Sequence, residues 1–83
     1  MRTKNEEQDA RRIIRMLRFY IDDATEAIVI DPCELDIYID DACIGDLRYA
    51  FSLDPDERDL IHLIAKILRE EYKLEVRIQC IDE

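Results

Sequence analysis

The chain has 83 residues and a formal net charge of −9, with apolar residues making up 48% and charged residues 40% of the sequence. This composition is too apolar for a disordered acidic tail and too charged for a membrane protein. The length predicts one domain, over residues 1–83, with a single modest core. No apolar run approaches the roughly 20 residues of a membrane span, and no signal peptide is expected.

The first predicted element is a helix from Glu6 to Ile21. Asn5 suits the N-cap position, and Gln8, three residues later, completes the pattern of a capping box. Apolar residues recur at helical spacing and form one stripe, which we expect to face the core. The members of this stripe are Ala10, Ile13, Ile14, Leu17, Tyr20 and Ile21.

The pattern then changes to the alternation that is typical of strands. A first strand is predicted at 26–31, and Asp31-Pro32 predicts a turn. A second strand is predicted at 34–41 and a third at 47–53, with a loop at 41–46 between them. The second strand has Leu35, Ile37 and Ile39 on one side and Asp36, Tyr38 and Asp40 on the other.

The second long helix has the clearest start signal in the chain. In Asp54-Pro55-Asp56-Glu57, an N-cap aspartate precedes a proline at the first helical position and an acidic first turn. The helix is predicted to run to about Tyr72, and a last strand covers 74–81. The fold class is therefore α+β in the order α-β-β-β-α-β. We expect a four-stranded, largely antiparallel sheet with both helices packed on one face.

Residue types that carry out catalysis are scarce. Ser52, His62 and Gly45 are the only residues of their kinds, whereas a phosphate-binding loop needs several glycines. His62 is predicted on the solvated side of the second helix. We therefore expect a protein that is not an enzyme and that binds neither a cofactor nor a specific metal ion.

Cys33, Cys43 and Cys80 are too widely spaced for a C-x-x-C motif. In a reducing cytoplasm, where we place the protein, they are expected to be free thiols. A small thiol enzyme that uses His62 with one of these cysteines is the alternative.

Charge is strongly segregated along the chain. Residues 1–21 carry a net charge of +3, residues 22–59 carry −11 and residues 60–83 carry −1. Acidity of this kind keeps a small protein soluble, and it also suits a docking surface for a basic partner. Sequence leaves both interpretations open. The predicted binding residues are Asp36, Tyr38, Asp40, Asp41, Asp46, Asp54, Asp56 and Asp59.

The basic first helix is a secondary candidate interaction face, formed by Arg11, Arg12, Arg15 and Phe19. An exposed Phe among arginines would bind a partner. The favoured interpretation is that the helix ends near Arg18 and that Phe19 turns inward to cap the core.

In size and acidity the chain resembles small phage- or plasmid-borne inhibitors that obstruct bacterial defence or DNA-handling proteins. We therefore expect a non-enzymatic interaction module that binds a basic protein surface, such as that of a nucleic-acid-binding protein, by mimicking nucleic acid. It would bind neither nucleic acid nor membrane directly. The alternative is an oligomeric adaptor, for example a homodimer, that uses the basic helix or an open sheet edge.

Overall fold

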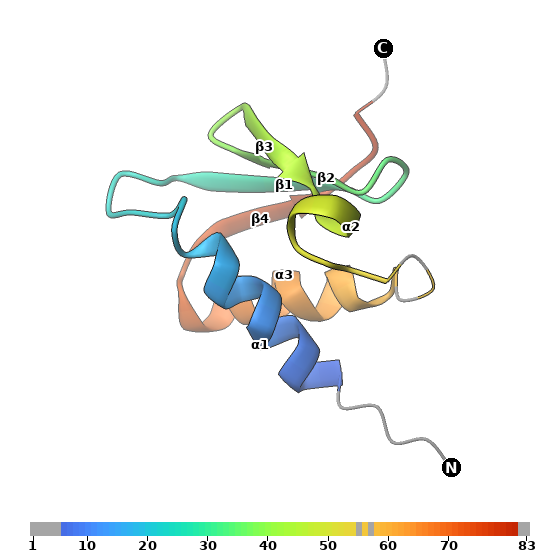
Figure 1. Cartoon of the computed structure of the whole chain (residues 1–83). Coiled ribbons are helices and arrows are strands. Elements are labelled where there is room, and N and C mark those ends of the chain that lie inside the picture. The colour runs from blue at the N-terminus through green and yellow to red at the C-terminus, as the bar shows by residue number, and fades with distance from the viewer. Residues whose placement is uncertain (1–5, 55, 57, 82–83) are drawn as a thin grey trace.

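The computed structural model describes residues 6–54, 56 and 58–81. Figure 1 shows the order of the elements and their arrangement. They are α1 (Glu6–Leu17), β1 (Ala27–Asp31), β2 (Asp36–Ile39), β3 (Ala42–Asp46), α2 (Leu47–Ala50), α3 (Leu60–Glu71) and β4 (Glu75–Ile78). This confirms a small α+β domain. The predicted capping residues Asn5, Pro55 and Glu57 lie outside the described residues.

The four strands form one mixed sheet in the order β3-β2-β1-β4. β2 pairs antiparallel with both β1 and β3, whereas β4 pairs parallel with β1. The last strand, β4, therefore extends the sheet beside β1, at the edge opposite β3. The expectation that both long helices cover a single sheet face stays a prediction.

The connection from β2 to β3 is tighter than the sequence indicated. Asp40 and Asp41 form a two-residue turn with positive φ values of 48° and 73°, and Ile39 pairs directly with Ala42. Aspartate tolerates this left-handed backbone conformation better than most residues do. The strand β3 therefore lies in the segment 42–46, which was predicted as a loop.

The strand predicted at 47–53 is wrong, because a short helix, α2, begins at Leu47. The Asp46 side chain accepts a hydrogen bond from the Arg48 backbone N–H at 2.7 Å and so caps that helix. Leu47, Phe51 and Leu53 are buried, whereas Tyr49 projects into solvent. The apolar alternation arose from a helical turn followed by residues that belong to neither a helix nor a strand.

The core is built from buried residues of β1, β2, β4, α2 and the two long helices. Helix α1 contacts α3, and α3 contacts β4. The apolar stripe predicted for the first helix is buried over α1, and the inward residues of the second predicted strand are buried as well. Of the described helices, none is long and apolar enough to cross a membrane.

The edge of the sheet at β4 is partly covered. Arg69, on α3, donates two hydrogen bonds to the Val76 carbonyl, at 3.1 and 2.7 Å. Val76 also belongs to the core. A strand edge whose carbonyl is already bound is a poorer template for pairing with a second chain.

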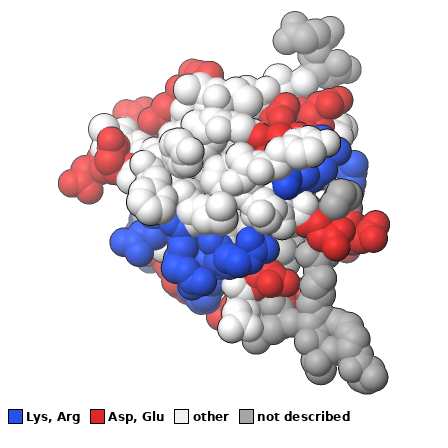
Figure 2. Space-filling model, viewed as in Figure 1, with Lys and Arg blue, Asp and Glu red and all other residues white. Residues whose placement is uncertain are grey.

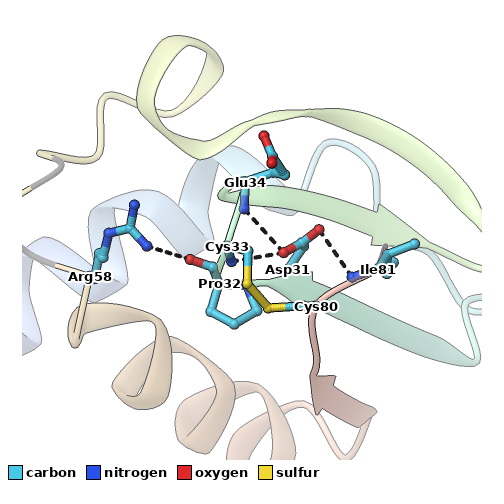
Figure 3. The surroundings of a disulfide bond; sticks show 7 residues. All are labelled: Asp31, Pro32, Cys33, Glu34, Arg58, Cys80 and Ile81. Atoms are coloured by element: carbon cyan, nitrogen blue, oxygen red, sulfur yellow. Dashed lines mark hydrogen bonds between the residues drawn. A yellow bond between two sulfur atoms is a disulfide. The ribbon is translucent and has the colours of Figure 1, made fainter. Parts of the chain in front are cut away.

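A disulfide bond joins Cys33 to Cys80, so the prediction of three free thiols is wrong. It links the turn after β1 to the segment after β4, across 47 residues of sequence, with a Cα–Cα distance of 5.6 Å (Figure 3). The parallel pairing of β1 with β4 brings these segments together, and that pairing was not predicted. Cys43, on β3, is a free and exposed thiol.

Candidate functional site

The residues that a thiol enzyme or a serine hydrolase would need lie on different elements of the fold. His62 is exposed on α3, Ser52 is exposed after α2, and two of the three thiols are bonded to each other. Within the described residues, no hydrogen bond joins His62 to Cys43 or to Ser52. In the described part of the chain, His62 is therefore not positioned as a base for either of these side chains.

Three aspartates form a row across one end of the sheet. Asp36 of β2 is the register partner of Asp31 on β1 and of Asp46 on β3, so the three side chains lie on the same sheet face. Carboxylates at directly opposite positions repel one another and destabilise a sheet. The fold compensates two of these charges, each in a different way.

Asp31 is compensated by the backbone. Its side chain is buried, and its two carboxylate oxygens accept hydrogen bonds from the N–H groups of Cys33 at 2.8 Å, Glu34 at 3.1 Å and Ile81 at 3.2 Å (Figure 3). Burial by itself raises the pKa of the Asp31 carboxyl, but the three N–H donors together outweigh it and hold the pKa below its ordinary value of 3.8. Asp31 therefore stays charged inside the fold.

Asp46 is compensated by an ion pair. Arg48 donates to its carboxylate from Nε at 3.1 Å and from Nη2 at 2.8 Å. The bond to Arg48 lowers the pKa of Asp46. The same guanidinium carbon lies 5.4 Å from the centre of the Tyr49 ring, within the range of a cation–π contact. Arg48 thus neutralises one end of the aspartate row.

Asp36, in the middle of the row, has no counter-ion among the described residues. Tyr38 is two residues further along β2 on the same face, and both side chains are half-buried. Tyr38 pairs across the sheet with Val29 on β1 and Cys43 on β3. Burial, followed by the charges of Cys43 and Asp36, raises the pKa of Tyr38, so its phenol stays protonated.

The other predicted acidic residues lie away from this pair. Asp40 and Asp41 follow the far end of β2, and the Asp40 carboxylate accepts hydrogen bonds from the N–H groups of Glu26 at 3.0 Å and Ala27 at 2.9 Å. Asp54, Asp56 and Asp59 are exposed between α2 and α3. Figure 2 shows acidic side chains in separate groups on the face in view. The described structure therefore concentrates the candidate site at Asp36, Tyr38 and their sheet neighbours.

The basic first helix also divides into two parts. Arg11 donates to Glu7 at 3.0 Å and to both carboxylate oxygens of Glu71 at 2.9 and 2.7 Å, and Arg12 donates to the Phe51 carbonyl at 3.3 Å. These two arginines are engaged within the fold. Arg15 and Phe19, by contrast, are exposed.

The expectation that Phe19 turns inward is wrong, because 89% of its surface is exposed. The helix ends at Leu17, and in the following turn Tyr20 is 52% exposed but keeps a contact with the core. The Tyr20 ring meets the buried Phe51 ring edge-on, with 6.2 Å between the ring centres. One aromatic residue of this adjacent pair is thereby used for packing, and the other is left in solvent.

Asp31, Cys33 and Cys80 are the described residues whose side chains best resemble a metal-ligand set, since their ligand atoms lie within 4.8 Å of one another. In this structure the two sulfurs are bonded to each other, and the carboxylate already accepts three N–H donors. These three side chains are therefore used to join the two chain segments.

Comparison with known proteins gives no relative from which a function can be transferred: no family model, curated protein or solved structure matches the chain.

Sequence patterns missed Asp31 as part of the aspartate row. Asp31 was interpreted only as a turn residue, because its neighbours on β2 and β3 depend on a register that a sequence does not reveal. The signal that favours α2 was present, since Asp46 stands one residue before Leu47 as an N-cap would.

Proposed function

We propose that this protein is a non-enzymatic interaction module that binds a basic surface of a partner protein through the outer sheet face at Asp36 and Tyr38. Nucleic-acid-binding proteins present such basic surfaces, and a carboxylate array that occupies one would act as an inhibitor by mimicry. The exposed acidic residues Asp41, Asp54, Asp56 and Asp59 would extend the contact.

The uncompensated Asp36 between Asp31 and Asp46 is the observation that carries this proposal. A row of three carboxylates costs stability, and the fold offsets that cost at both ends but not in the middle. A side chain whose charge weakens the fold and lacks an internal partner is well suited to an external one. β2 is paired on both sides, so little conformational entropy is lost when Asp36 is bound.

Tyr38 adds the other component of a binding hot spot. Tyrosine is enriched among the residues that contribute most of the binding free energy of an interface, because its ring is rigid and its hydroxyl can hydrogen-bond. Here it is half-buried beside Asp36 and flanked by Val29 and Cys43. An arginine of the partner would pair with the carboxylate while it stacks on the ring.

The test is affinity capture from the native host with three immobilised proteins: wild type, Asp36→Lys and Glu70→Lys. Glu70 is exposed on α3, so Glu70→Lys is a control that makes the same change in charge at a position outside the sheet. We expect wild type and Glu70→Lys to retain the same basic protein and Asp36→Lys to retain roughly tenfold less of it. Added duplex DNA and added salt should both release the captured protein. Equal capture by Asp36→Lys would rule out the proposed site.

The cytoplasmic location expected from the sequence is part of this proposal. A reducing compartment opens accessible disulfides, and both cysteines of the Cys33–Cys80 bond are exposed. Because Asp31 lies beside that disulfide, capture should be measured with and without reductant.

A further inference from the structure

A second surface, opposite in charge to the sheet site, lies at the end of α1. Arg15, Arg18 and Phe19 line a hollow of about 470 Å³. Figure 2 shows basic side chains gathered over α1, next to uncharged surface. We name the three residues that line the hollow the Arg–Phe surface.

The two arginines of this surface differ from the others in the described part of the chain. Each of the other arginines donates to a carboxylate or a backbone carbonyl: Arg11, Arg12, Arg48, Arg58, Arg69 and Arg77. Arg15 and Arg18 have no such partner among the described residues. In a protein with 21 acidic residues, two neighbouring guanidiniums without an anion are unexpected.

Capping of the helix C-terminus does not account for the two unpaired arginines. Cations near a helix C-terminus usually bind its last carbonyls. Here the carbonyls of Ile14, Met16 and Leu17 already accept hydrogen bonds from the backbone N–H groups of the turn that follows, at 2.9, 3.3 and 2.8 Å. The guanidinium groups of Arg15 and Arg18 are therefore left free for an external anion.

The backbone of Phe19 is held in place on this surface. The turn at 18–21 is fixed by the same backbone hydrogen bonds, and the adjacent Tyr20 is anchored by its edge-on contact with Phe51. Phe19 therefore cannot turn inward without breaking the Tyr20 contact. An exposed aromatic ring on a fixed backbone, beside two cations, suits a ligand that is both anionic and apolar.

We propose that the Arg–Phe surface binds a short acidic peptide segment in which carboxylates flank an apolar or aromatic side chain. The carboxylates would pair with Arg15 and Arg18, and the apolar side chain would pack on Phe19. A nucleic acid offers anions and flat bases as well, but its regular phosphates would extend over the rest of a chain whose net charge is −9. The neighbouring Asp22 and Asp23 line the next hollow together with Arg18 and would repel any anion that extended beyond the Arg–Phe surface, which favours a short ligand.

The proposal is tested by NMR titration of the isotope-labelled full chain with a short synthetic peptide of alternating Glu and Phe. The matched control peptide has Gln in place of Glu. We expect shifts of the Nε–H signals of Arg15 and Arg18 and of the Phe19 amide with the Glu peptide, and at least about tenfold weaker binding of the Gln peptide.

Two variants sharpen the result. Arg15→Gln/Arg18→Gln and Phe19→Ser should each weaken binding roughly tenfold. The control variant Lys66→Gln/Arg77→Gln removes the same charge from α3 and β4 and should bind within about twofold of wild type.

Equal affinity for the Gln peptide would overturn the proposal. So would tighter binding of a thymidine oligonucleotide, or a dimer of the chain alone that Phe19→Ser abolishes. None of these outcomes depends on Asp36, so the sheet site is tested separately.

Discussion

The outer sheet face and the end of α1 handle their charges in opposite ways. On the sheet, two of three neighbouring aspartates are compensated, Asp31 by backbone N–H groups and Asp46 by Arg48. At the end of α1, neither Arg15 nor Arg18 has a partner in the described structure. The comparison shows that net charge is a poor guide to which surface binds a partner, because two of the three aspartates in the row are already compensated within the fold. What distinguishes a candidate contact is a fixed side chain whose charge the fold has not used.

The largest effect on stability should come from the disulfide near the aspartate row. Replacing Cys33 and Cys80 by Ser removes a link that spans 47 residues, and we expect it to cost about 2–4 kcal/mol of unfolding free energy. Chemical denaturation of the variant and of the wild type measures this cost. The peptide affinity of the Arg–Phe surface should be unchanged, and a loss there would show that the two regions are coupled.

Asp31→Ala should have the next largest effect, a destabilisation of about 1–3 kcal/mol, because three N–H groups lose a charged acceptor. The pKa of Asp31 in the folded protein lies below its ordinary value of 3.8. Its contribution to stability is therefore complete above that value and is lost as the pH falls through the folded pKa. The stability difference between wild type and Asp31→Asn should shrink over that pH range. A difference that stays constant there would contradict this assignment.

The adjacent aromatic residues should respond differently to substitution. Tyr20→Ala removes the edge-on contact with Phe51 and should cost about 0.5–1.5 kcal/mol. Phe19→Ser should change the unfolding free energy by less than about 0.5 kcal/mol, because the ring is exposed. Thermal unfolding of the two variants makes the comparison. A large loss of stability in Phe19→Ser would place its ring in the core.

The smallest expected effect is a gain in stability. Asp36→Asn removes the uncompensated charge between Asp31 and Asp46 and should stabilise the protein by about 0.2–1 kcal/mol, more at low salt than at high salt. Glu70→Gln serves as the control for a neutralised acid elsewhere. If both variants were equally stabilised, general repulsion in an acidic chain would account for the effect, and the row would have no special role.

Much of the fold could be predicted from periodicity, and the rest depended on long-range pairing. The helices α1 and α3 and the strands β1, β2 and β4 lie within their predicted segments, because each carries a repeated apolar pattern. The turn at Asp40 and Asp41 and the helix α2 were missed, since Leu47, Tyr49, Phe51 and Leu53 alternate like a strand. The disulfide was missed because it follows from the pairing of β1 with β4.

The candidate site was predicted in part. Periodicity correctly placed Asp36 and Tyr38 on the face of β2 opposite the core. It could not distinguish acidic residues that serve the fold, such as Asp40, from Asp36, because hydrogen bonds to distant backbone groups decide that difference. The exposure of Phe19 depended in the same way on the contact between Tyr20 and Phe51.

The most direct test of the sheet site is an NMR titration of the labelled chain with an oligoarginine peptide. We predict that amide shifts concentrate at Asp36, Tyr38 and Cys43 and that Asp36→Asn abolishes them, whereas Glu70→Gln leaves them intact. Shifts of similar size at acidic residues throughout the chain, unaffected by Asp36→Asn, would mean that the acidity has no localised binding role and would contradict the account.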